Sequence, residues 1–441
     1  MKFLLKLSCF FLSIVSFFIT SSACLSAELI ADEDFIFDIK EFENKGFDWG
    51  GYVEVKWDHV DFNQDGVFYL LNSNHAQEST LDSLTGSLLL GGDYSIGAAS
   101  FYGLFKASGR QDNYGWIDLA EIYEAYVDIK PSPRVTAGLG KKLYRWGKGY
   151  AWNPVGFINR SKDPNNPEEA LEGCVTAEVD LIKSFTGSLQ NSALTLVAIP
   201  VYENVNEEFG VQDNLNFGAK LYLLYKDTDI DFVLYTGNSR STRFGIDFAK
   251  NLASNFEIHG ELAYVPSLDN IILSEEGFAQ RQDISSLSGL IGLRYLSEND
   301  ITSIVEYYHN GAGYTEDELD RFFQLAKNGI DQFHTTHTDT VLNKARELSL
   351  QGYGKPYPGK NYLYGKLTQK EPFDILYFTP GITAIVNLDG LSSSITPELA
   401  YTGITNWEIR FRFSYLSGRN SSEYGEKQNS SKLELRVRYF F

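Results

Sequence analysis

Hydrophobic and polar residues alternate along the last ten positions of the chain, residues 432–441. One side of an extended strand would carry Leu433, Leu435, Val437, Tyr439 and Phe441, and the other Lys432, Glu434, Arg436, Arg438 and Phe440. This two-residue period predicts a strand with one apolar and one polar face. A half-buried strand of a soluble sheet would alternate in the same way, so this segment alone does not identify the compartment.

Segments of the same kind recur from residue 50 onward. We expect strands at 50–60, 82–94, 96–109, 117–130, 133–146, 173–184, 191–202, 213–226, 229–238, 242–251, 254–265, 285–297, 301–310, 360–369, 374–387, 391–402, 406–417 and 430–441. About ten residues is the length that a tilted strand of a membrane barrel requires. The pattern predicts an all-β fold, a transmembrane antiparallel β-barrel of about 18 strands. A barrel of 16 stays open, because two weak hairpins around 229–251 could be divided wrongly.

The connections between these segments alternate between long and short. With the N-terminus in the periplasm, the odd connections are expected to be long external loops and the even ones short turns. The long ones are 61–81, 147–172, 203–212, 266–284, 311–359 and 418–429, with short exceptions at 237–241 and 389–390. After residue 27 no stretch approaches the roughly 18 continuous apolar residues of a membrane helix. A chain that enters the membrane would therefore need a closed sheet without free edges.

The longest connection, 311–359, is expected to contain helix. Thr315 and Glu318 have the spacing of a capping box. An apolar helix face follows at Leu319, Phe322, Phe323 and Ala326, and a second at Leu342, Ala345 and Leu348. An apolar face must be covered, so this loop is expected to pack onto the barrel mouth or to fold into it.

The N-terminus has the features of a secretory signal peptide. Lys2 and Lys6 precede an apolar run, Leu7–Ile19, and the small residues Ser21-Ser22-Ala23 follow. We divide the chain into a signal peptide (1–27, cleaved near 23–27), an acidic segment (28–47) that is too short for a plug domain, and a barrel (48–441). Lipidation of Cys24 stays open, although Ser21 stands where a lipobox usually has Leu.

Cysteine content and charge narrow the class further. Cys9 leaves with the signal peptide and Cys24 can leave with it, so Cys174 is left without a partner and no disulfide framework is expected. The net charge is −20, and it becomes −22 once the two positive charges of Lys2 and Lys6 are removed. This balance argues against nucleic-acid binding. It fits solvated acidic loops.

Four arginines are predicted to face the lumen. If Ile409, Phe411, Phe413 and Tyr415 face lipid, the inward positions of the last two strands include Arg410, Arg412, Arg436 and Arg438. Such a ladder would raise the local concentration of anions and bind carboxylate or phosphate. The alternative is that the arginines only pair with Glu408, Glu434 and with Glu54 or Asp58 of the first strand.

A second candidate region starts on the fifth predicted strand. Lys142 is expected to point inward, and the chain continues with the aromatic and basic residues Trp146, Lys148, Tyr150 and Trp152. These could form a constriction loop in which rings stack on sugars and bases bind acidic groups. The alternative is an interfacial aromatic belt with basic residues that meet lipid head groups. The Gly-Lys-Gly at 147–149 lacks the spacing of a phosphate-binding loop.

Signals for enzymatic chemistry are weak. His334 and His337 lie three positions apart with Asp331 and Asp339 nearby, but a metal would need further ligands that this spacing does not supply. No histidine stands in a recognisable catalytic set. We therefore expect no catalytic residues, no metal and no cofactor.

Several motifs are similar to those of a known family. The segments Arg145–Pro154, Glu306–Gly311 and Glu371–Ile375 resemble motifs of bacterial porin-type barrels related to alginate-export proteins. The resemblance implies an eighteen-stranded outer-membrane channel with an arginine-rich lumen that guides an anionic polysaccharide. The terminal aromatic residue, Phe441, resembles the signal read by the barrel assembly machinery. That machinery, outer-membrane lipid and lipopolysaccharide, and a small or polymeric solute are the expected partners.

The leading functional hypothesis is a passive outer-membrane channel for anionic or carbohydrate solutes. A different class is a non-conducting barrel that serves as a surface receptor, adhesin or anchor, suggested by the large loop 311–359. A barrel enzyme would require a role for His309 or His337.

Overall fold

The computed structural model describes residues 47–72, 78–275 and 277–441. The predicted signal peptide, Cys24 and residues 28–46 of the acidic segment lie outside these ranges. The residues from Trp49 to Phe441 form one compact unit. Within the described residues, no helix has the length and apolar character needed to cross a membrane.

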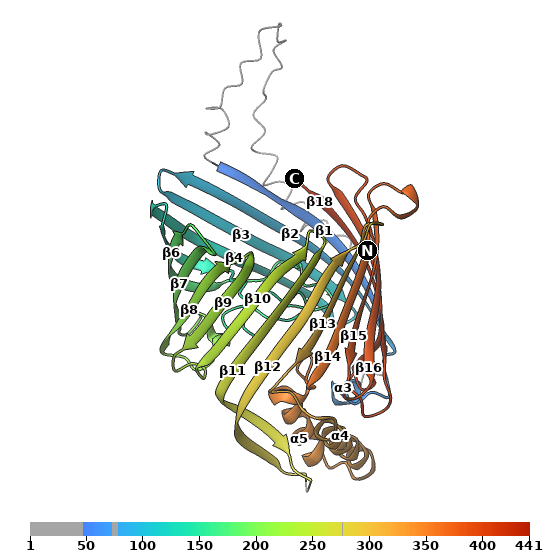
Figure 1. Cartoon of the computed structure of the whole chain (residues 1–441). Helices are drawn as coiled ribbons and strands as arrows, with labels where there is room; N and C mark the ends of the chain where they lie inside the picture. Colours follow the sequence, from blue (N-terminus) through green and yellow to red (C-terminus); the bar gives the residue numbers. More distant parts are fainter. Residues whose placement is uncertain (1–46, 73–77, 276) are drawn as a thin grey trace. The chain divides into compact units, whose positions relative to one another are not determined.

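Eighteen antiparallel strands make up this unit (Figure 1). They are β1 (Phe47–Phe62), β2 (Thr80–Ile96), β3 (Ala99–Asp112), β4 (Gly115–Ser132), β5 (Val135–Lys142), β6 (Cys174–Ser184), β7 (Leu189–Val201), β8 (Asn214–Tyr225), β9 (Thr228–Thr236), β10 (Arg243–Ala253), β11 (Phe256–Leu273), β12 (Ala279–Leu296), β13 (Ile301–His309), β14 (Asn361–Gln369), β15 (Phe378–Asn387), β16 (Ser392–Tyr401), β17 (Trp407–Ser417) and β18 (Asn429–Phe440). Each strand pairs with its neighbours in sequence, and β1 pairs with both β2 and β18. The sheet is therefore closed, and the prediction of 18 strands is confirmed.

The alternation seen in the sequence separates an outer from an inner face. On β18, Leu435 is 40% exposed whereas Arg436 is 4% exposed. The same alternation brings large apolar side chains to the outer surface on strand after strand, for example Phe217 on β8, Ile291 on β12 and Leu367 on β14. An apolar outer belt around a closed sheet is the arrangement that a lipid environment requires.

The closure of the barrel involves the last residue of the chain. β1 and β18 are in register from Tyr52 opposite Phe440 onward. Gly51 and Phe441 exchange two backbone hydrogen bonds of 3.2 and 3.1 Å, and the rings of Trp49 and Phe441 lie 5.8 Å apart. The terminal aromatic residue thus fastens the seam between the first and last strands.

Odd and even connections lie at opposite ends of the barrel, which we call the outer and inner end respectively. The prediction of a long loop at 266–284 is wrong. β11 continues to Leu273 and β12 already begins at Ala279, so only a short turn joins them. This extension was missed because Asp269, Gln280 and Arg281 break the alternation. Beyond the membrane no lipid demands an apolar outer face, so a strand there carries no such pattern.

A group of helices covers part of the outer end, opposite the C-terminus (Figure 1). It consists of α3 (Val67–Asn72), α4 (Glu316–Thr336), α5 (Thr340–Leu348) and the π-helix η2 (Ser349–Tyr353), and we call it the outer helical cluster. Short 3-10 helices are η1 (Glu207–Phe209) and η3 (Pro372–Asp374). The sequence did not indicate α3.

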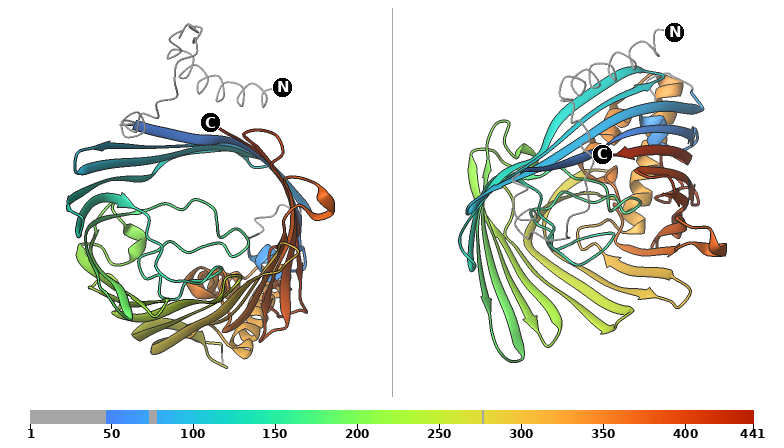
Figure 2. Two further views of the ribbon diagram at one scale, coloured as in Figure 1. Left: turned by 45° about the horizontal axis from the view of Figure 1, so that its top comes forward. Right: turned by 90° about the horizontal axis from the view of Figure 1, so that it is seen from above.

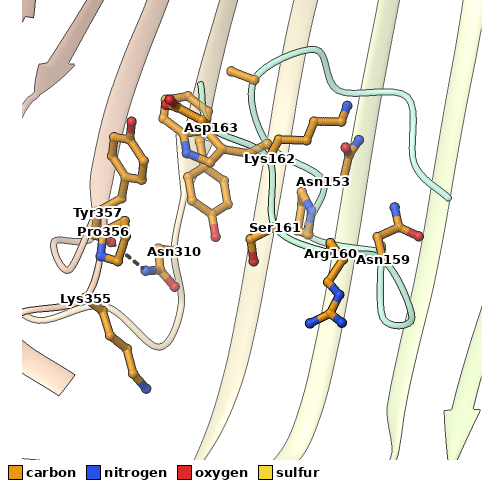
Figure 3. A pocket seen from close by; sticks show the side chains of 15 residues that line it. Asn153, Asn159, Arg160, Ser161, Lys162, Asp163, Asn310, Lys355, Pro356 and Tyr357 are labelled. Carbon is orange, nitrogen blue, oxygen red and sulfur yellow. Dashed lines mark hydrogen bonds between the residues drawn. The ribbon is translucent and has the colours of Figure 1, made fainter. Parts of the chain in front are cut away.

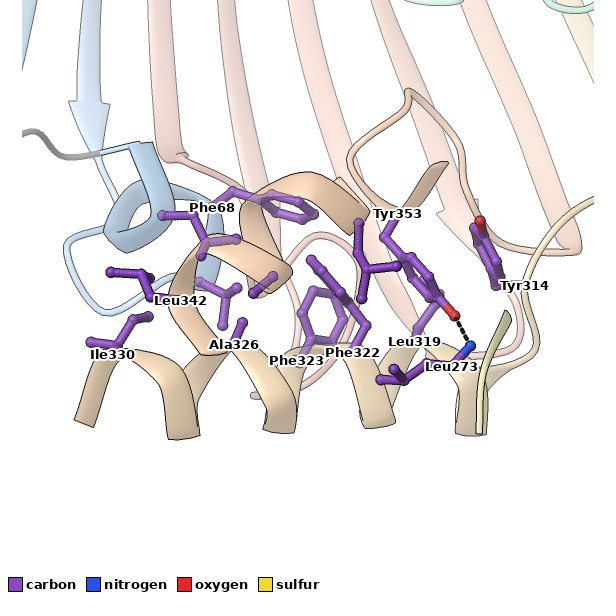
Figure 4. Close-up of a cluster of buried hydrophobic side chains, with 14 residues drawn as sticks. Phe68, Leu273, Tyr314, Leu319, Phe322, Phe323, Ala326, Ile330, Leu342 and Tyr353 are labelled. Carbon is purple, nitrogen blue, oxygen red and sulfur yellow. Dashed lines mark hydrogen bonds between the residues drawn. The ribbon is translucent and has the colours of Figure 1, made fainter. Parts of the chain in front are cut away.

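The predicted helical features of the loop 311–359 are confirmed. Thr315 and Glu318 form the capping box, and both predicted apolar faces are buried. They pack with α3 and with Leu273 at the end of β11, whose backbone N–H donates to the hydroxyl of Tyr353 at 3.0 Å (Figure 4). The loop therefore packs onto the barrel mouth, one of the two arrangements expected.

Candidate functional site

The connection between β5 and β6, residues 143–173, runs through the inside of the barrel (Figure 2), and we call it the inward loop. Its bounds differ from the predicted 147–172, because β5 ends at Lys142. Side chains of β9, β10, β11, β13 and β14 bind its first part, and side chains of β16 and β17 bind Asn165 and Asn166 further along. The loop thus spans from one wall of the barrel to another.

Two buried carboxylates hold the backbone of the inward loop. Glu261 on β11 accepts hydrogen bonds from the backbone N–H groups of Lys148 and Gly149, both 2.6 Å, and from the Asn153 side chain at 2.9 Å. Glu306 on β13 accepts from the backbone N–H groups of Tyr150 and, at 2.9 Å, Ala151. These contacts fix the course of the loop by its backbone.

A second pair of carboxylates binds the loop through one lysine. Asp231 on β9 and Asp247 on β10 face each other across the two strands and are each 1% exposed. The Nζ atom of Lys148 lies 2.8 Å from Asp231 and 3.8 Å from Asp247. One ammonium thus partly balances two buried carboxylates, and its removal would leave both without this partner.

Side chains of β14 and β17 also bind the inward loop. Tyr150 receives a hydrogen bond from Lys366 on β14 at 2.8 Å and donates to Glu168 at 3.0 Å. Arg412 on β17 donates to the side-chain oxygen of Asn166 at 3.1 Å. The loop is thus bound at several strands between β9 and β17, and it divides the space inside the barrel (Figure 2).

The structure places the two tryptophans of this region inside the barrel in packed clusters. Trp146 is 4% exposed and packs with Val155, Phe157 and Ile158 of the same loop. Trp152 is stacked on Tyr308, with 5.1 Å between the ring centroids. Trp146 is therefore available neither for sugar stacking nor for a lipid belt, and Trp152 is largely covered, with 9% of its surface exposed. The sequence showed that aromatic residues occur in this loop, but not that other side chains would bury them.

All four candidate arginines lie on the inner face, and each is close to a carboxylate. Arg438 donates to Glu54 at 2.6 Å, and Arg412 is bound to Glu398. Arg410 lies 3.3 Å from Glu408, and Arg436 lies 3.8 Å from both Glu54 and Glu408. Lys142, also directed inward, is bound to Glu178 and lies 3.4 Å from Asp128. The basic residues of this wall are thus largely balanced by carboxylates.

Two adjoining cavities are among those that border the inward loop. The larger, about 550 Å³, lies between the loop and the segment that ends the outer helical cluster (Figure 3). Its lining includes Trp152, Asn153, Asn159, Arg160, Lys162, Asp163, Tyr308, Asn310, Lys355 and Tyr357. The smaller, about 320 Å³, shares Asp163, Pro356 and Tyr357 with the first and reaches the wall of β16 to β18.

The larger cavity has an excess of basic side chains. Arg160 is paired with Glu172 and Glu208, each at 2.9 Å. Lys162 donates instead to the carbonyl oxygens of Gly149 and Tyr150, at 2.9 and 3.3 Å, and burial lowers its pKa. Within the described part of the chain, neither Lys162 nor Lys355 lies in an ion pair with a carboxylate.

Sequence reasoning missed the four carboxylates that hold the loop. Their signal was present: Glu261 and Glu306 occupy inward positions on strands whose outward positions are apolar. Their partners could not be found without the path of the loop. Across the described ranges no group of three or more His, Cys, Asp or Glu residues is arranged for a metal ion, and His309 contacts the side chain of Asn361 at 2.9 Å.

No protein-family model and no curated protein sequence matches the chain. Among solved structures it is similar to the outer-membrane protein OprD of Pseudomonas aeruginosa, with a TM-score of 0.51, 8% identity, and coverage of 90% of this chain and 94% of that one. It is also similar to OccK7 (OpdD) of Pseudomonas aeruginosa, with a TM-score of 0.52, 10% identity, and coverage of 90% and 99%. A third is Pseudomonas aeruginosa OccK2 (OpdF) in complex with glucuronate, with a TM-score of 0.50, 12% identity, and coverage of 90% and 98%.

At these identities the similarity concerns the fold. It does not extend to the alginate-export resemblance of the three sequence motifs. Two of those motifs nevertheless meet in the structure, because Glu306 binds the backbone of Tyr150 and Ala151. A closed sheet of 18 strands, an apolar outer belt and a loop folded into the lumen together indicate a bacterial outer-membrane protein with the porin fold.

Proposed function

We propose that this protein is a passive outer-membrane channel in which the inward loop favours anionic or carbohydrate solutes. The observation that carries the proposal is the loop itself, held by carboxylates of β9 to β13 near its start and by Arg412 on β17 at Asn166. A loop fixed in this way narrows a water-filled lumen and sets the side chains that a solute meets.

The larger cavity supports the proposed class of solute. Lys162, Lys355 and Arg160 line this cavity together with one carboxylate, Asp163, and this excess of positive charge favours the entry of anions. The amides of Asn153, Asn159 and Asn310 line the same space and can exchange hydrogen bonds with hydroxyl groups. Acidic sugars combine both features. Glucuronate, with which OccK2 forms a complex, belongs to this class.

The proposed mechanism is diffusion and requires no chemical step. Fixed positive charge lowers the electrostatic barrier to anions, while the absence of tight, deep binding lets the solute leave. We propose no enzymatic role. A non-conducting receptor or adhesin would use the outer helical cluster instead and would show no ion current.

The test is conductance of the purified, full-length barrel in planar bilayers under a KCl gradient. We expect anion selectivity, and a current that glucuronate reduces more than glucose does. Lys355→Gln removes an exposed charge at the cavity and should lower the chloride-to-potassium permeability ratio about twofold at low salt, the order expected of one partly screened charge.

The matched control is Lys370→Gln, which removes an exposed lysine from a turn at the inner end. Its selectivity should equal that of the unaltered protein. Cation selectivity together with no effect of either sugar would contradict the proposed solute class, whereas equal effects of glucuronate and glucose would favour neutral carbohydrates over anions. If folded protein is inserted and the bilayer still shows no current, the non-conducting receptor or adhesin would be supported instead.

A further inference from the structure

One turn at the inner end differs from the others. By the strand bounds, the connection between β14 and β15 contains eight residues, 370–377, whereas the other turns at this end contain two to five. It includes the motif Glu371–Ile375, which the inward loop and its cavities do not use. We call it the turn 370–377.

The turn 370–377 exposes an unusual amount of apolar surface. Phe373 is 92% exposed, the largest value among the exposed large apolar residues in the described ranges, and Leu376 is 63% exposed. Ile375 and Tyr377 are about half exposed. The turns Lys226-Asp227 and Ser254-Asn255 at the same end are polar. Burial of such surface is favourable, so an environment that covers it would stabilise the turn.

The backbone of the turn is held in place at a conformational cost. Four of its residues other than glycine, namely Glu371, Phe373, Asp374 and Tyr377, have φ between 49° and 62°. The Glu371 carboxylate accepts a hydrogen bond from the backbone N–H of Tyr377 at 2.8 Å, which closes the turn. The N–H of Thr402, in the neighbouring turn, donates to the Tyr377 carbonyl at 3.1 Å. A strained backbone that specific hydrogen bonds hold in place suggests that the exposed side chains of the turn have a function.

The direction of the turn identifies what covers it. Figure 2 shows the orange turn outside the barrel wall in both views, so it projects away from the lumen. The outer faces of the strands that lead into it carry Leu363 and Leu367 on β14 and Ile382 on β15, which belong to the lipid-facing belt. The apolar surface of the turn is therefore continuous with surface that already faces lipid.

We propose that the turn 370–377 is an interfacial anchor that places Phe373 and Leu376 among the phospholipids of the leaflet at the inner end, which long external loops identify as the periplasmic leaflet. Apolar side chains of interfacial segments lie at the boundary between head groups and acyl chains. A soluble periplasmic protein fits less well, because it would approach along the barrel axis rather than from the side. This proposal depends on membrane insertion and not on the solute.

The test uses site-directed spin labels on the full-length barrel in vesicles of phosphatidylethanolamine and phosphatidylglycerol. Phe373→Cys and, separately, Leu376→Cys carry the label in a Cys24→Ser background, in which the remaining Cys174 is 2% exposed. The control is Thr186→Cys in the turn between β6 and β7 at the same end, where the residue is exposed and polar. Accessibility to molecular oxygen and to a water-soluble nickel chelate is then compared.

We expect labels at positions 373 and 376 to collide at least threefold more often with oxygen than with the nickel chelate, and the control label to show the reverse. Preference for the nickel chelate at both positions would place the turn in water and overturn the proposal. Exclusion of both probes would indicate coverage by protein, either a second copy or another chain, and would overturn it as well.

Discussion

The anchoring of the inward loop predicts a large effect from a single change, Glu261→Gln. In the structure the Glu261 carboxylate accepts from Lys148, Gly149 and Asn153 at one oxygen, and from the backbone N–H of Val155 at 3.2 Å at the other. Glutamine preserves the shape and one acceptor oxygen. It removes the charge and turns an N–H₂ group toward backbone donors.

The size of the effect follows from the number and kind of hydrogen bonds lost. Hydrogen bonds to a charged acceptor contribute roughly 1.5–3 kcal/mol each, and neutral ones about 1 kcal/mol. Weakening each of three bonds by roughly 0.5–2 kcal/mol and losing the fourth should therefore cost the docked loop at least about 3 kcal/mol. Because 1.4 kcal/mol corresponds to a factor of ten, the opening equilibrium of the loop should rise at least about 100-fold.

The assay is native-state hydrogen exchange of the backbone amides of Lys148 and Gly149 in detergent or nanodiscs. These amides should lose protection by about the factor above, and single-channel recordings should show more frequent current fluctuations. Glu257→Gln is the matched control, since Glu257 lies on the same inward row of β11 and does not contact the loop. Unchanged protection in Glu261→Gln, or equal loss in both variants, would refute the reasoning.

Two further predictions concern the ends of the barrel. Thr315→Ala removes the N-cap of α4 and should destabilise the first turn of this helix by about 1 kcal/mol. Hydrogen exchange should become faster in that turn and stay unchanged in the strands. Unchanged exchange in the turn would contradict the assignment of the cap. Deletion of Phe441 removes two backbone hydrogen bonds and a ring contact at the seam between β1 and β18. The barrel should therefore unfold at a lower temperature, measured as the heat-dependent shift of its electrophoretic band, than the control Phe440→Tyr, which keeps these contacts. Equal unfolding temperatures would show that the seam does not depend on the last residue.

The outer face of the barrel could be predicted from the sequence because lipid imposes one rule on every outward position. Leu433, Leu435 and Val437 alternate with charged residues for this reason, and the strand count followed. The rule ends where lipid ends. The extension of β11 and β12 beyond the membrane, around Asp269 and Arg281, therefore carried no signal.

For residues of the inner face, the sequence predicted that the side chain points inward but not which residue it contacts. The inward position of Arg412 followed from Phe411 and Phe413, yet its partner Glu398 lies on β16 and depends on the register of two strands. Inside the barrel, water and protein both accept polar side chains, so composition does not tell a solvated residue from a bonded one. Trp146 shows the same limit, since its burial depends on a loop path that no periodicity encodes.

This distinction also bears on the use of net charge to infer selectivity. The chain carries −20 overall, which by itself would favour cations in the lumen. Yet Glu261 and Glu306 are buried and accept hydrogen bonds from the loop backbone, and Asp231 and Asp247 are buried next to Lys148. Carboxylates used in this way bind the loop backbone and Lys148 and do not line the larger cavity, whereas Lys162 and Lys355 do. An acidic chain can therefore form an anion-selective constriction, and the reversal potential measured with Lys355→Gln tests that separation between total charge and lumen charge.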